Sequence, residues 1–247
     1  MNRFIPTGRL VRISMNSIQG FTLIEMAILL AVAGTLMLGA VSAIRVQSAK
    51  ANLEKTQQAM REIEQVLLGF IAMTGSLPCP DWYVGTVADG QENRDAVTGL
   101  CTDSPDGQQT GLLPWQSLGI KPMDKWGNFY SYRVSSAFTV NGGYNFDTNG
   151  DMEVYSGGGT LLLSNIPVMV ISHGPNGHGA YAMNLDTNLK RPFAAATALE
   201  KENIIDDGDN PDNPNPERFY QAGDDILMWI SPDVVKLRAL ESNWLLP

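Results

Sequence analysis

The chain has 247 residues, of which 26 are Asp or Glu and 17 are Lys or Arg, so its formal net charge is -9. This length accommodates an N-terminal segment followed by one folded domain of about 150–200 residues. An acidic chain is poorly suited to nucleic acid, because phosphate contacts require clustered Lys and Arg. We therefore expect no contact with nucleic acid.

The segment from Phe21 to Ile44 contains one charged residue, Glu25, among its 24 residues. A helix rises about 1.5 Å per residue, so this segment is long enough to cross a bilayer core of about 30 Å. We therefore expect a transmembrane helix over residues 21–44. A carboxylate in such a helix is costly and needs a positive partner. The N-terminal amine created by cleavage after Gly20 would be such a partner.

Residues 1–20 have the composition of a leader that stays in the cytoplasm. They contain three arginines and no acid, and the positive-inside rule then places the rest of the chain outside. An ordinary secretory peptide has a shorter apolar region, and its cleavage site follows that region. Here the apolar run follows the candidate site. Met15 is an alternative start to Met1, but it would discard all three arginines.

The stretch Gly20-Phe21-Thr22-Leu23-Ile24-Glu25, with the apolar run behind it, resembles the class III signal of type IV pilins and type II secretion pseudopilins. The resemblance implies that a prepilin peptidase cuts between Gly20 and Phe21 and methylates the Phe21 amine. It also implies that Glu25 neutralises a subunit N-terminus during filament assembly. One departure is that residues 17–19 lack the basic residue usual near the cleavage glycine. The alternative is a plain signal anchor, which stays uncut.

A second apolar pattern follows, with spacings that alternate between three and four as in an a/d heptad stripe. Its members are Val46, Ala49, Leu53, Thr56, Met60, Ile63, Leu67 and Phe70. Gly75 is placed to end the helix, and Pro78 prevents it from resuming. We expect one helix from about Phe21 to Thr74. Residues 45–75 would be its amphipathic continuation, packed on the C-terminal domain, with a free coiled coil as the alternative.

The two cysteines, Cys79 and Cys101, both lie in the part of the chain expected outside the cytoplasm. An oxidising periplasm favours a disulfide between them. They flank a loop rich in Gly, Pro and Asp that such a bond would constrain. Two buried free thiols are the alternative.

Residues 76–247 contain several short segments typical of strands: residues 129–134, 160–163, 168–172 and 226–230. The segment from Asp124 to Tyr132 resembles the Asp-x-Trp-Gly-Asn-x-x-x-Tyr stretch that opens the small antiparallel sheet of the major pseudopilins. We expect a pilin-like α+β fold, with a long N-terminal transmembrane and amphipathic helix packed on a small antiparallel β-sheet domain with long loops. Residues 201–216, rich in Asp, Asn and Pro, predict an exposed loop.

Two segments resemble the halves of the calcium loop of the major pseudopilins, residues 174–179 and residues 223–229. This resemblance puts Asp224 and Asp225 forward as metal ligands, although Asn176 stands where an acid is more usual. Turn formation before a buried strand is the alternative role of the two aspartates. No cofactor is required, and Ca²⁺ is the one ion that the sequence suggests. The acidic run 147–153 lacks the Gly and Glu of an EF-hand and predicts a polar hairpin tip.

The two histidines, His173 and His178, do not make a catalytic site by sequence. A zinc site needs further His or Cys ligands, and the Gly-x-Ser-x-Gly motif of many hydrolases is absent. We therefore expect no enzymatic activity.

Together these features predict a structural subunit of a type IV pilus-like or type II secretion pseudopilus filament. We expect a single-pass protein of the bacterial inner membrane, with its C-terminal domain in the periplasm, that later joins the filament. The expected partners are prepilin peptidase, other pilin or pseudopilin subunits, the inner-membrane assembly platform and membrane lipid. The alternative is a signal-anchored periplasmic calcium-dependent enzyme or binding protein.

Overall fold

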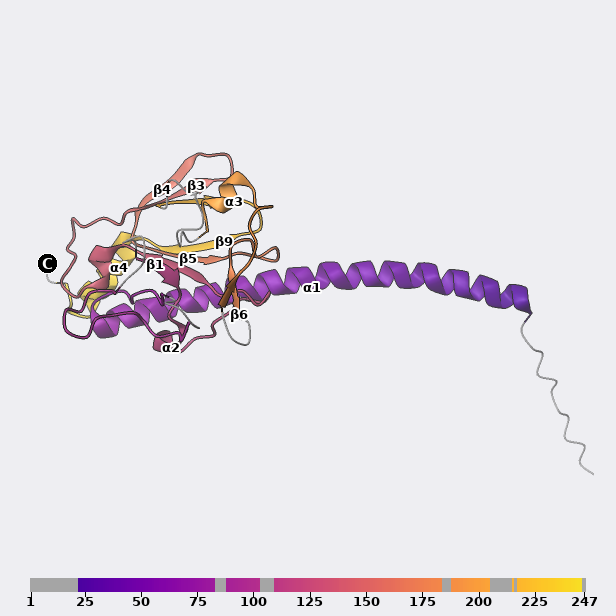
Figure 1. Cartoon of the computed structure of the whole chain (residues 1–247), viewed down its shortest axis with the longest axis horizontal. Coiled ribbons are helices and arrows are strands. Elements are labelled where there is room, and N and C mark those ends of the chain that lie inside the picture. The colour runs from indigo at the N-terminus through magenta and orange to yellow at the C-terminus, as the bar shows by residue number, and fades with distance from the viewer. Residues whose placement is uncertain are drawn as a thin grey trace, which may run out of the picture. The chain divides into compact units, whose positions relative to one another are not determined.

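The structure is a computed structural model of the chain, shown in Figure 1. It describes residues 22–82, 88–102, 109–183, 188–204, 215 and 217–245. The chain forms two compact units, residues 1–48 and residues 49–247. Helix α1 (Leu23–Thr74) begins in the first unit and ends in the second.

The predicted transmembrane helix over residues 21–44 is wrong. Among the described residues, no helix is long and apolar enough to cross a membrane. The predicted span includes the charged Glu25, and a carboxylate within a membrane helix is costly.

The C-terminal half of α1 buries one face in the second unit. Thr56, Met60, Ile63 and Leu67 are all at most 3% exposed, which confirms this part of the predicted stripe. The stripe then continues through Ile71, not through Phe70 as predicted. A straight α-helix has 3.6 residues per turn, so a buried face drifts away from a strict heptad. The predicted packing of this half of the helix on the chain's own domain is confirmed, and the alternative, a free coiled coil, is wrong.

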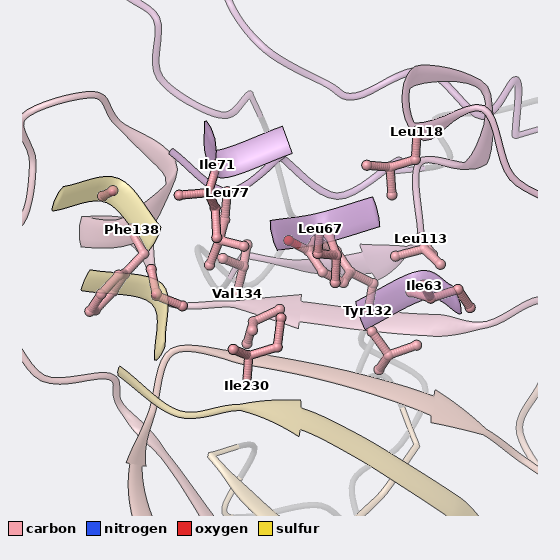
Figure 2. Close-up of a cluster of buried hydrophobic side chains, with 14 of the residues drawn as sticks. Ile63, Leu67, Ile71, Leu77, Leu113, Leu118, Tyr132, Val134, Phe138 and Ile230 are labelled. Atoms are coloured by element: carbon pink, nitrogen blue, oxygen red, sulfur yellow. The ribbon is translucent and has the colours of Figure 1, made fainter. Parts of the chain in front are cut away.

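A four-stranded antiparallel sheet lies against this face of α1. Its strand order is β1-β2-β5-β9, formed by β1 (Thr110–Leu112), β2 (Ser131–Val134), β5 (Val168–Ser172) and β9 (Ile226–Ile230). Figure 2 shows side chains of α1 lying over Tyr132, Val134 and Ile230 of the sheet. The predicted strands at residues 168–172 and 226–230 are confirmed.

A second sheet covers the other face of β5. It has the order β4-β3-β8, formed by β4 (Leu161–Ile166), β3 (Met152–Ser156) and β8 (Arg218–Gln221). Val168 and Val170 pack toward α1, whereas Met169 and Ile171 pack toward this second sheet. The continuous apolar run of β5 follows from burial on both faces, and the layers are visible in Figure 1. The α+β class is confirmed, but β3 and β8 are parallel, so the sheets are not purely antiparallel as predicted.

The remaining elements are short and lie around these layers. They are α2 (Trp115–Leu118), the 3₁₀ helix Ser136–Thr139, β6 (Tyr181–Met183), β7 (Asn188–Lys190), α3 (Ala198–Lys201) and α4 (Pro232–Glu241). Side chains of α4 and of the residues after it donate hydrogen bonds to carbonyls in the last two turns of α1. Arg238 Nε donates to the Leu68 carbonyl at 3.3 Å, and Trp244 Nε1 donates to the Ala72 carbonyl at 2.9 Å. The Ala72 carbonyl is one of the last four of α1, which a helix end leaves without intrahelical partners.

Gly75 ends α1 as predicted. Its φ is 76°, in the left-handed region, and its amide donates to the Ile71 carbonyl at 2.8 Å, as in an αL cap. A Cβ at this position would lie 2.8 Å from the ring of Trp244. Glycine is therefore required both by the backbone conformation and by the close approach of the indole.

The predicted Cys79–Cys101 disulfide is confirmed, with the two Cα atoms 5.4 Å apart. Arg94 lies inside the loop that it closes. Its guanidinium donates to the carbonyls of Leu77, Gly99 and Thr139 at 2.6–3.1 Å and pairs with Glu92 at 2.9 Å. One side chain thus ties the two ends of this loop to the segment after β2.

Candidate functional site

The start of α1 is closed by a reciprocal cap between Thr22 and Glu25. Glu25 Oε2 accepts from the Thr22 backbone amide and from the Thr22 hydroxyl, both at 2.9 Å, and the Glu25 amide donates to the Thr22 hydroxyl at 3.3 Å. This is a capping box. These hydrogen bonds, from the Thr22 backbone first, lower the pKa of the Glu25 carboxyl. Our sequence analysis missed it, although a Thr three residues before a Glu at the head of an apolar run is its usual signal.

The cap uses one of the two carboxylate oxygens of Glu25. Within the described residues, Oε1 has no hydrogen-bond partner and no basic group pairs with the carboxylate. The surrounding apolar side chains are exposed in this unit, with Leu23 at 92%, Leu30 at 68% and Leu36 at 70%. A large exposed apolar surface marks a place of interaction. Gly20 and Phe21, the predicted processing site, lie outside the described residues.

The two predicted halves of the calcium loop do come together. The backbone amide of Asn176 donates to Asp224 Oδ2 at 2.9 Å, and the Asn176 side-chain amide donates to Asp224 Oδ1. The same amide nitrogen lies 3.0 Å from Glu200 Oε1, a residue of α3 that the sequence analysis did not include. Gly174 makes the approach feasible, because a Cβ there would lie 2.3 Å from the Asp224 carbonyl oxygen.

Asp225 does not join this group. Its Oδ2 accepts from the Asn203 side chain at 2.8 Å, and its Oδ1 lies 3.7 Å from His173 Nδ1. Neighbouring residues at the start of a strand point in opposite directions. The structure therefore separates the two predicted ligands, Asp224 and Asp225.

The group around Asp224 has some of the chemistry of a cation site. Burial raises the pKa of the Asp224 carboxyl, and the nearby charges of Asp225 and Glu200 raise it further. The Asn176 nitrogen, not its oxygen, faces the two carboxylates, because the His178 amide donates to the Asn176 oxygen at 2.9 Å. Among the described residues, no group of three or more His, Cys, Asp or Glu side chains is placed to hold a metal.

The acidic side chains at residues 151 and 153, within the run 147–153, do not face a common site. Asp151 pairs with Arg133 at 3.2 Å, and Glu153 accepts from the Tyr155 hydroxyl at 2.7 Å. The two acids therefore bind different partners. Their geometry agrees with the sequence, which does not predict an EF-hand here.

A polar line inside the domain joins Ser131, His173 and Asp225. Ser131 Oγ lies 2.8 Å from His173 Nε2, and His173 Nδ1 lies 3.7 Å from Asp225 Oδ1. The order resembles that of a hydrolase triad. However, Ser131 is 1% exposed, His173 is fully buried, and the serine lies within a sheet strand and not on an exposed turn. This arrangement joins β2, the end of β5 and the start of β9, and offers no substrate a path to the serine in this conformation.

The Asp-x-Trp-Gly-Asn segment has a clear local role. Asp124 Oδ1 accepts from the amides of Trp126 and Asn128 at 2.8 and 3.0 Å, and Asp124 Oδ2 accepts from the Ser172 hydroxyl at 2.7 Å. The Asn128 side chain donates to the Gly174 carbonyl at 2.9 Å. The segment thus ties the entry of β2 to the end of β5 and to the loop that follows.

Comparison of the chain with protein-family models, with curated proteins and with solved structures found no match.

Proposed function

We propose that this chain is a non-enzymatic structural subunit of a type IV pilus-like or pseudopilus filament. It is matured by prepilin peptidase between Gly20 and Phe21 and assembled through the start of α1. The observation that carries the proposal is the head of this helix, where one carboxylate lies among exposed apolar side chains.

The two units of the chain differ in how they bury apolar side chains, which suits them to different roles in a filament. Residues 49–247 contain their own core, which includes one face of the C-terminal half of α1. The apolar side chains from Leu23 to Met37 belong to the other unit and are exposed. Their burial is favourable by about 25 cal/mol per Å² of apolar area. Packing against the same helix of neighbouring subunits would bury them without disturbing the folded domain.

Glu25 serves this assembly with the oxygen that the cap leaves open. Oε2 is occupied by Thr22, whereas Oε1 has no partner among the described residues. In a filament, Oε1 accepts from the methylated Phe21 amine of an adjacent subunit. Once the apolar neighbours exclude water, this pairing sets the register of the subunits because an unpaired carboxylate is costly there.

Two variants separate the charge of Glu25 from its capping role. Glu25→Gln retains a capping-box residue but removes the charge, whereas Thr22→Ala removes the cap and retains the charge. We expect both proteins to be cut after Gly20, as intact mass would show. Crosslinking between subunits should be lost in Glu25→Gln and retained in Thr22→Ala. Uncut wild-type protein in cells with an active prepilin peptidase, or normal crosslinking of Glu25→Gln, would refute the proposal.

A second candidate, a periplasmic calcium-binding protein, is favoured by the meeting of Asp224, Glu200 and Asn176. The disulfide fits an oxidising compartment in both cases. Cleavage distinguishes the two candidates, because a calcium-binding role does not require a mature chain that begins at Phe21.

A further inference from the structure

A side chain blocks one edge of the second sheet. The Tyr220 amide on β8 donates to Asn203 Oδ1 at 2.8 Å, and Asn203 Nδ2 donates to the Tyr220 carbonyl at 2.9 Å. The Asn203 side chain thus takes the place that a further strand would occupy. Unpaired strand edges readily pair with another chain, and natural proteins commonly block them in this way or with charges and prolines.

The opposite edge of this sheet, formed by β4, is open. All residues from Thr160 to Asn165 are exposed, and β4 pairs with β3 on one side only. Three consecutive leucines on this edge, Leu161, Leu162 and Leu163, are 48%, 45% and 40% exposed. The strand contains no Lys and no Pro, the residues with which natural edges discourage pairing.

Leu162, in the middle of this exposed segment, has no partner in the sheet. Val154 of β3 pairs with Leu163, and the next residue, Tyr155, pairs with Leu161, so the register skips Leu162. The extra residue of a β-bulge is left unpaired. A backbone N–H and a C=O at the centre of the leucine run are therefore available to another strand.

The sequence of this edge is suited to a second copy of the same chain. Thr160-Leu161-Leu162-Leu163-Ser164 reads nearly alike in both directions. In an antiparallel pair centred on Leu162, the leucines cover one another's exposed area, and Thr160 lies opposite Ser164, a favourable cross-strand pair. Residues 156–167 contain no charged residue, so two chains of net charge -9 can meet here without like charges in contact.

We propose that two copies of the chain pair through β4, antiparallel and about a twofold axis at Leu162. The interface is isologous, because the same strand contributes from both copies. It lies on the side of the domain away from the C-terminal half of α1 (Figure 1). The pairing therefore does not depend on the proposed filament role, which uses the start of α1. One pair of short strands buries little area, so the dimer should be weak.

Cysteine crosslinking of the full-length chain in detergent tests the register. Leu162→Cys should form a disulfide-linked dimer under mild oxidation, because the two copies of this position face each other with Cβ atoms about 5 Å apart. Thr160→Cys is the matched control on the same edge. Its two copies would lie about 13 Å apart along the strands and should not react. A mixture of Thr160→Cys and Ser164→Cys should react, because these positions are opposite each other.

Leu162→Lys tests the affinity. The side chain is exposed, so the melting temperature should stay unchanged, but two ammonium groups would face each other across the axis. Sedimentation over a range of concentrations should show a weak wild-type dimer and at least tenfold weaker association of Leu162→Lys. Leu237→Lys, at a leucine of α4 that is 54% exposed, is the matched control and should associate as wild type does.

Three results would each overturn the proposal. The first is a wild-type protein that stays monomeric at millimolar concentration. The second is equal crosslinking of Leu162→Cys and Thr160→Cys, which would show that the contact is not in this register. The third is wild-type association of Leu162→Lys, which would place the contact elsewhere on the chain.

Discussion

Thr22 and Glu25 hold each other at the first turn of α1, because one carboxylate oxygen of Glu25 accepts from both the amide and the hydroxyl of Thr22 at 2.9 Å. Glu25 is therefore a helix cap in the folded chain. The assembly role that we propose for it would use the other carboxylate oxygen, so substitutions can separate the two roles.

The cap should weaken in acid. The pKa of the Glu25 carboxyl is lowered from its ordinary 4.5 in the folded helix, so the stabilisation is present above pH 4.5 and is lost as the pH falls through the lower folded value. Cα chemical shifts of residues 23–25 should move toward coil values in that range. Glu25→Gln, which cannot titrate, is the control. The same shift in Glu25→Gln would show that another group causes it.

Gly75→Ala should destabilise the domain by about 2 kcal/mol or more. The alanine Cβ meets the Trp244 ring at 2.8 Å and the backbone must keep a φ of 76°. Gly69→Ala is the matched control, since the same methyl group enters open space in a helix interior. That variant should gain about 0.5–1 kcal/mol. Urea unfolding measures both, and equal stabilities would contradict the cap geometry.

Reduction of the Cys79–Cys101 disulfide should lower the free energy of unfolding by about 3 kcal/mol, from the chain-entropy model for a loop of this length. The bond joins residues 22 positions apart. Denaturant unfolding with and without dithiothreitol gives the difference. A Cys79→Ala, Cys101→Ala double variant should show no effect of the reductant. A folded wild-type protein whose two thiols react freely with an alkylating agent would refute the bond.

Asn176→Asp should increase the response of the protein to calcium. It places a third carboxylate beside those of Asp224 and Glu200, which Asn176 now satisfies with its amide nitrogen. Without calcium the variant should melt below wild type, because three close carboxylates repel one another. With millimolar calcium its melting temperature should rise more than that of wild type, since Ca²⁺ prefers several oxygen ligands. An equal calcium response of the two proteins would count against this site.

Stability should fall between about pH 4 and pH 7 because of Asp81. Burial raises the pKa of this carboxyl from 3.8 to about 7, although a hydrogen bond from the Gly90 amide at 2.8 Å opposes the shift. The folded state therefore binds the proton more tightly than the unfolded state does. Its contribution is greatest below the unfolded pKa and is lost as the pH rises through the folded pKa. Asp81→Asn should flatten this part of the pH profile of chemical unfolding, and an unchanged profile would exclude Asp81 as its source.

Local patterns in the sequence determined several elements of this protein. The end of α1 at Gly75, the buried stripe from Thr56 to Leu67 and the strands at residues 168–172 and 226–230 all depend on neighbours a few residues away. The disulfide was predictable for another reason, because a chain with two cysteines allows one intramolecular pairing. The transmembrane assignment rested on length and on one tolerated charge, but no helix among the described residues is long and apolar enough to cross a membrane.

Only the tertiary structure decided how the polar groups are combined. Asn176 and Asp224 are 48 residues apart, yet they are bound together, while the adjacent Asp225 turns to Asn203. Composition and periodicity state which residue types are present and which face they share, but not which loops meet.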